Sequence, residues 1–79
     1  MKVPRDLYGR ELADHLIRRW DYRETHQTGS HIVLRTELPS AQTLPIPAHK
    51  PMRIGTLTAI LRMVSEHKRA SRSEILRGL

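Results

Sequence analysis

The sequence predicts one small α+β domain, in which helices cover one face of a three-stranded antiparallel sheet in the order α-β-β-β-α. Apolar residues recur at helical spacing in the first and last thirds of the chain, and a β-branched run bounded by turn signals lies between them. A chain of 79 residues has room for one hydrophobic core. We expect a single domain over residues 1–79, with its core at 6–64 and a C-terminal extension at 65–79.

The first helix is predicted between Tyr8 and Trp20. Its apolar residues fall on one stripe of a helix, and they are Tyr8, Leu12, Ala13, Leu16, Ile17 and Trp20. Pro4 or Asp6 suits the start of this helix. Asp21 is expected just beyond its end, because aspartate tolerates the left-handed conformation better than most residues.

Three extended segments joined by two turns are predicted next, at residues 22–27, 31–37 and 42–47, with the turns at 28–30 and 38–41. Short turns between consecutive strands favour an antiparallel meander. The third segment contains Pro45 and Pro47, which have no N–H group to donate to a neighbouring strand. We therefore expect this segment to be an edge strand or to be only partly paired.

A second amphipathic helix is predicted around Leu57, Ile60, Leu61 and Val64, which have helical spacing. Gly55 or Thr56 is expected near its N-cap. Further along, Ser71 and Glu74 match a capping box, which predicts a short additional helix at the C-terminus.

Alternation along the middle strand assigns its residues to two faces. The face expected to lie beneath the helices consists of Ile32, Leu34 and Thr36, together with Leu44 and Ile46. His31 and Arg35 are then expected on the open face, towards solvent. A β-bulge directly after the turn at Gly29 would reverse the direction of His31.

Composition excludes several classes of protein. The chain has no cysteine, so it has no disulfide framework, no thiolate zinc site and no cysteine nucleophile. We expect no membrane span, because no apolar run is long enough, and the sequence is compatible with a cytoplasmic location. A formal net charge of +6 predicts a polyanionic partner, either nucleic acid or an acidic protein.

The sequence places His31 directly after the turn signal Thr28-Gly29-Ser30. Imidazole exchanges protons near neutral pH, so a histidine beside RNA can deprotonate a 2′-hydroxyl and start cleavage of the adjacent phosphodiester without a metal. The alternative is that His31 is a polar strand residue with no chemical role, and composition alone favours this alternative. Ser30 and His31 are not expected to form a nucleophile–base pair, because adjacent strand residues point to opposite faces.

Other histidines suggest no metal site or cofactor, since none has a partner at ligand spacing. The loop that contains His49, Lys50 and Arg53 has the cations to hold a phosphate, although a solvated loop with no binding role is an equally good interpretation. The basic residues of the C-terminal extension are interpreted as a solvated surface.

Four short motifs follow one another along the chain: GREL at 9–12, GSH at 29–31, IPAH at 46–49 and GTL at 55–57. Their order and spacing resemble the HicA toxins, small mRNA interferases of prokaryotic toxin–antitoxin pairs. The resemblance implies a fold similar to the double-stranded-RNA-binding domain and a catalytic histidine that corresponds to His31. It also implies a partner, the antitoxin HicB, which masks that histidine. The family commonly has glycine and then an aromatic residue where the first helix ends, whereas this sequence has Asp21 and Tyr22.

The expected function is therefore that of a metal-independent endoribonuclease that cleaves mRNA, with His31 as its general base. Residues expected to bind RNA or to stabilise charge on the reacting phosphorus are Gly29, Ser30, Arg23, Arg35, His49, Lys50 and Arg53. Two alternatives stay open. The chain is either a non-catalytic RNA-binding module that reads RNA shape and phosphates, or an inactive toxin-like protein that only binds its antitoxin.

Overall fold

In the computed structural model of the protein, residues 4, 6–48 and 51–79 are described. Its elements are α1 (Gly9–Arg19), β1 (Arg23–Thr28), β2 (His31–Thr36), β3 (Gln42–Pro47), α2 (Ile54–Lys68) and α3 (Arg72–Leu76). The predicted α+β order, with a short helix at the C-terminus, is confirmed. Within these residues, no helix is both long and apolar enough to cross a membrane.

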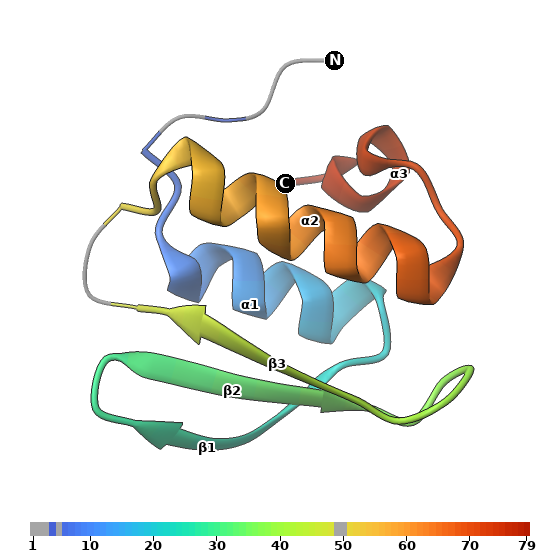
Figure 1. The fold of residues 1–79 in the computed structure, drawn as a ribbon, viewed down its shortest axis with the longest axis horizontal. Coiled ribbons are helices and arrows are strands. Elements are labelled where there is room, and N and C mark those ends of the chain that lie inside the picture. Colours follow the sequence, from blue (N-terminus) through green and yellow to red (C-terminus); the bar gives the residue numbers. More distant parts are fainter. Residues whose placement is uncertain (1–3, 5, 49–50) are drawn as a thin grey trace.

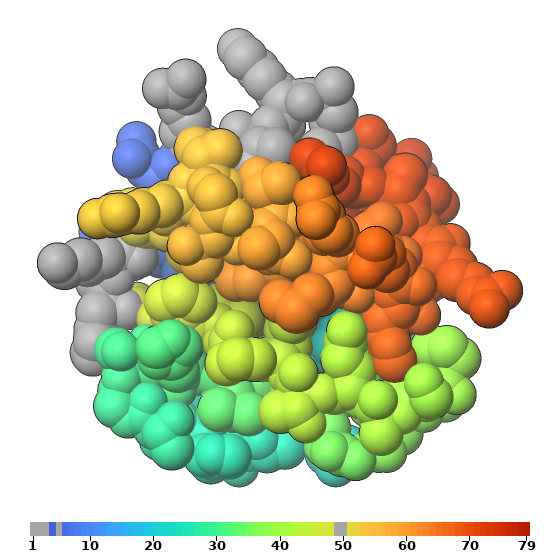
Figure 2. Space-filling view, viewed as in Figure 1, coloured from blue at the N-terminus to red at the C-terminus, as the bar shows by residue number. Residues whose placement is uncertain are grey.

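The strands form one antiparallel sheet in the order β1-β2-β3, so β2 is central and β3 is an edge strand as predicted. Figure 1 shows the helices gathered on one side of this sheet, and Figure 2 shows the strands and helices as two layers. The N–H of Ala48 donates to the carbonyl oxygen of Ser30 at 2.7 Å. By alternation, the backbones of Pro45 and Pro47 face away from β2, where a missing N–H costs no hydrogen bond.

The hydrophobic core lies between the sheet and the helices. The side chains predicted for the covered face, Ile32, Leu34, Thr36, Leu44 and Ile46, are all fully buried. The helices contribute Leu12, Leu16, Leu57, Leu61 and Val64. Thr36, which is polar, accepts a hydrogen bond of 2.9 Å from Nζ of Lys68. Alternation therefore predicted correctly which face of β2 lies beneath the helices, but Val33, on the other face, is largely buried as well.

The C-terminal extension packs on the domain. Ser71 Oγ accepts from the N–H of Glu74 at 3.1 Å, and a Glu74 carboxylate oxygen accepts from the N–H of Ser71 at 2.9 Å. The predicted capping box is thus present at the start of α3. Ile75 of α3 is fully buried in the same core as the residues of α1 and α2.

The helix ends differ in part from the prediction. Asp21 follows α1 with φ of 62°, as predicted for its left-handed position. Tyr8, however, is the N-cap of α1, and no side chain caps it, so neither Pro4 nor Asp6 has the expected role. The second helix begins at Ile54, and its N-cap is Arg53, not Gly55 or Thr56 as predicted. The helix starts before the first residue of its apolar stripe, which was the pattern used to predict its start.

Gly9 brings the first turn of α1 directly against the end of β3. A Cβ atom at this position would lie 1.7 Å from the carbonyl oxygen of Pro47, which no packing tolerates. Glycine therefore fixes how closely the start of this helix approaches the strand that pairs with His31.

Candidate functional site

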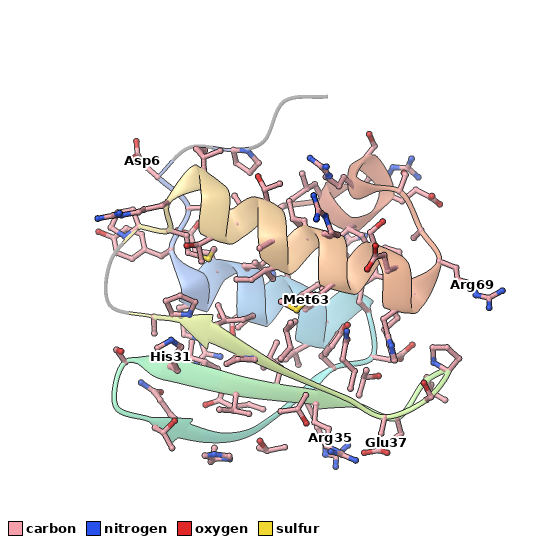
Figure 3. All side chains as sticks on the ribbon, in the orientation of Figure 1. Asp6, His31, Arg35, Glu37, Met63 and Arg69 are labelled. Carbon is pink, nitrogen blue, oxygen red and sulfur yellow. The ribbon has the colours of Figure 1, made fainter. Side chains whose placement is uncertain are left out.

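His31 is the first residue of the central strand, and it lies at one end of the sheet (Figure 3). It pairs with Thr28 across the tight turn of Gly29 and Ser30, and with Pro47 of β3 on its other side. Because His31 pairs directly with Thr28, there is no bulge at the turn to reverse its direction. The side chain is exposed while that of the following residue is fully buried, which places the imidazole on the open face as predicted.

The turn before His31 is short and unobstructed. Gly29 has φ of 53°, which is in the left-handed region that glycine adopts without strain, and a Cβ added there would meet nothing within 4 Å. The backbone beside His31 is therefore open to a ligand.

Ser30 lies closer to His31 than strand alternation predicted. Its Oγ is 3.4 Å from Nδ1 of the imidazole, because Ser30 belongs to the turn and alternation does not apply to it. This distance is longer than the nucleophile–base hydrogen bonds of catalytic pairs, so the two residues do not form such a pair. The hydroxyl instead lies beside Nδ1, and within the described residues Nε2 of His31 forms no hydrogen bond.

The N-termini of α1 and α2 lie at the same end of the sheet as His31 (Figure 1). Gly9 brings α1 against Pro47, and the N–H of Met52 donates to the carbonyl oxygen of Leu7 at 2.8 Å. The first turn of α2 contains no acidic residue, whereas the first turn of α1 contains Glu11. Each helix N-terminus carries a partial positive charge of about half an elementary unit, so this end of the molecule attracts anions.

Arg53 is the only predicted phosphate-binding cation of the loop that falls within the described residues. It is exposed, and it forms no ion pair with the rest of the described chain. His49 and Lys50 lie outside the described residues.

Arg23 and Arg35 do not join His31. The strand rises about 3.3 Å per residue, which puts Arg35 about 13 Å from His31, and Arg23 faces Arg35 on β1. Both guanidinium groups contact the Glu37 carboxylate, at 2.6 Å for Arg35 Nε and 3.6 Å for Arg23 Nη2. The hydrogen bond from Arg35 lowers the pKa of Glu37, and the same bond raises the pKa of Arg35. The expectation that these arginines act on the same phosphate as His31 is therefore not supported.

The structure adds His26 to the open face, where sequence reasoning had not placed it. It lies on β1, is exposed, and has Nδ1 3.1 Å from Oγ1 of Thr25. The available signal was a repeated pattern, because each of these two histidines follows a hydroxyl residue. The described part of the chain contains no group of three or more residues arranged to hold a metal ion.

Searches with this chain against protein-family models, curated proteins and solved structures gave no match.

Proposed function

We propose that the protein is an endoribonuclease of the mRNA interferase type, and that it acts as the toxin of a HicA-like toxin–antitoxin pair. The observation that carries this proposal is the exposed imidazole of His31, at the end of the sheet where both helix N-termini gather. A proton-exchanging group beside an anion-attracting surface is what cleavage of a phosphodiester requires.

In the proposed reaction, Nε2 of His31 removes the proton from a ribose 2′-hydroxyl. The 2′-oxygen attacks the adjacent phosphorus, the bond to the 5′-oxygen breaks, and that oxygen takes up a proton, which gives a 2′,3′-cyclic phosphate and a 5′-hydroxyl. General base catalysis of this kind supplies about 10²–10⁴-fold. Arg53 and the N–H groups at the two helix N-termini would stabilise the negative charge on the phosphorane.

The proposed substrate is mRNA, and the proposed protein partner is a HicB-like antitoxin that covers His31. The net charge of +6 supports both, because it attracts RNA and complements an acidic protein surface. The proposed location of the pair is the cytoplasm, where mRNA is translated.

The test is cleavage of a structured mRNA in EDTA by the wild-type protein, His31→Ala and a control, Gln27→Ala. Gln27 lies on the same hairpin and is exposed, but it faces Ile32 and so belongs to the opposite face. We expect the wild type and the control to cut, and His31→Ala to bind RNA without cutting it. Cleavage by a folded His31→Ala protein would exclude this mechanism. If all three proteins bind RNA with the same salt dependence and none cuts, the non-catalytic RNA-binding function is favoured instead.

A further inference from the structure

A second histidine shares the open face of the sheet with His31. His26 of β1 lies directly opposite Val33 of β2, and His31 is two residues from Val33 along that strand. Diagonal neighbours of this kind are about 7–8 Å apart in an antiparallel pair. Both histidines are exposed, and neither contributes to the hydrophobic core. Their rings are therefore accessible to a ligand, and they lie on either side of Val33, which is largely buried on the same face.

The hairpin turn puts His26 on this face, because the pairing of Thr28 with His31 across the turn places His26 opposite Val33. Glu24 faces Leu34, but the following pair joins His26 to Val33, which leaves Thr25 as the extra residue. Without the extra residue, the register set at the turn would pair Glu24 with Arg35 and place the Glu24 carboxylate on the open face. The bulge thus moves Glu24 to the helix side of the sheet and keeps its carboxylate off the face that carries the two histidines.

Each of the two histidines has the hydroxyl of its preceding residue beside Nδ1. The Thr25 hydroxyl lies 3.1 Å from Nδ1 of His26 and donates its own proton to the carbonyl oxygen of Val33 at 3.2 Å. The Thr25 oxygen is therefore the acceptor for the proton on His26 Nδ1. Within the described residues Nε2 of His26 forms no hydrogen bond, so this nitrogen is the one available to a substrate.

We infer that His26 is the general acid of the reaction in which His31 is the general base. The inference rests on the proposed function, because it names the second proton-transfer group of the same reaction. Displacement at phosphorus needs a base beside the attacking oxygen and an acid beside the leaving oxygen, and these two oxygens lie on opposite sides of the phosphorus. Two imidazoles at diagonal positions of one sheet face can flank a phosphodiester in this way.

The complete step conserves protons. Nε2 of His31 takes the proton of the 2′-hydroxyl, and the 2′-oxygen forms a bond to phosphorus. As the bond from phosphorus to the 5′-oxygen breaks, Nε2 of protonated His26 gives its proton to that oxygen. The products are a 2′,3′-cyclic phosphate and a 5′-hydroxyl, and proton exchange with water returns both histidines to their starting states.

The charged residues near His26 are those on the open face of the sheet. Its other diagonal neighbour is Arg35, which is ion-paired with Glu37, and Arg23 lies beyond the bulge on the same strand. Glu24 belongs to the opposite face, where its carboxylate binds a residue of α1. Among the described residues His26 has no ion pair, so no carboxylate competes with a substrate for its ring.

The test compares two substrates that differ in their leaving groups. A uridylyl dinucleotide needs a proton on its leaving 5′-oxygen, whereas uridine 3′-(4-nitrophenyl phosphate) releases a stable nitrophenolate without one. We expect His26→Ala to lower kcat for the dinucleotide by about 10²-fold or more and to change kcat for the nitrophenyl ester little. His31→Ala should slow both substrates, because both need the base. The wild-type kcat should show a bell-shaped pH profile, and His26→Ala should lose the alkaline limb, since an acid must be protonated to act.

Two further variants separate catalysis from structure. His26→Asn keeps an N–H group that can donate to Thr25, but an amide is too weak an acid to protonate the leaving oxygen, so this variant should behave like His26→Ala. Gln27→Ala should behave like the wild type. Full activity of His26→Ala on the dinucleotide, or equal losses on both substrates, would overturn the assignment of His26 while leaving the role of His31 intact. Failure of the wild type to cleave either substrate would overturn the proposed function and this inference with it.

Discussion

Nε2 of His15, on α1, donates a hydrogen bond of 2.6 Å to the carbonyl oxygen of Ile75, on α3. Both residues are fully buried, and they are 60 positions apart in the sequence. This bond joins the first helix of the domain to the C-terminal extension. The extension is therefore part of the folded domain and contributes to its hydrophobic core.

Replacement of His15 tests that connection. We expect His15→Ala to lower the free energy of unfolding by about 3 kcal/mol, because it leaves a cavity and an unpaired buried carbonyl. Urea denaturation measures this change. The control is His67→Ala, which removes a bond of 2.8 Å from a partly exposed ring to the carbonyl oxygen of Ser40. It should cost about 1 kcal/mol or less. If both variants lose the same free energy of unfolding, the buried hydrogen bond of His15 contributes no more to stability than the exposed one of His67.

Two glycines in the helices should respond to alanine in opposite directions. Gly9→Ala should destabilise the protein by about 1–3 kcal/mol or more, because its Cβ would lie 1.7 Å from the Pro47 carbonyl oxygen. Gly55→Ala meets nothing within 4 Å and should stabilise α2 by about 0.5 kcal/mol. Thermal unfolding of both variants checks the pair. A neutral Gly9→Ala would mean that α1 can move away from the strand without cost.

Alkaline pH should destabilise the protein, because unfolding allows Tyr22 to ionise more easily. Burial raises the pKa of this phenol to about 12, and its hydroxyl donates to Oε1 of Gln42 at 2.5 Å. The ordinary tyrosine pKa is 10.0, so the stabilisation is fully present below pH 10 and is lost as the pH rises towards 12. Measured against pH, the stability of Tyr22→Phe should fall less steeply in this window than that of the wild type. Parallel curves for the two proteins would contradict the prediction.

The salt dependence of RNA binding should reveal whether RNA runs along the open face. Glu37→Gln removes the carboxylate that now pairs with Arg23 and Arg35. We expect tighter binding and a plot of log K against log salt that steepens by about 1–2, since each added phosphate contact contributes about 0.9. Glu66→Gln makes the same charge change on α2, and its slope should stay at the wild-type value. Identical slopes for Glu37→Gln and the wild type would place the RNA away from this part of the sheet.

The sequence predicted best where residues have a repeating apolar pattern. Leu12 and Leu16, or Ile32 and Leu34, mark which side of an element is buried, and the structure agrees with each of them. The bulge at Thr25 could not be predicted in this way, because every residue of β1 is exposed and none fixes the register.

The candidate site was predictable only in part for a similar reason. His31 follows a recognisable turn signal, so its position at the strand start was readable from local sequence. The separation of Arg35 from His31 depends on distance along a strand, and its pairing with Glu37 depends on side-chain geometry. The contact of Gly9 with Pro47 joins residues 38 positions apart, which no local pattern reports.

The two prolines of β3 also bear on aggregation. With Pro45 and Pro47 facing outwards, that edge cannot donate a regular ladder of hydrogen bonds to an incoming chain. The opposite edge, β1, carries a bulge and polar side chains throughout, which disfavours flat stacking against a second sheet. A small sheet with both of its edges protected in this way resists fibril formation, even when the concentration of the protein is high.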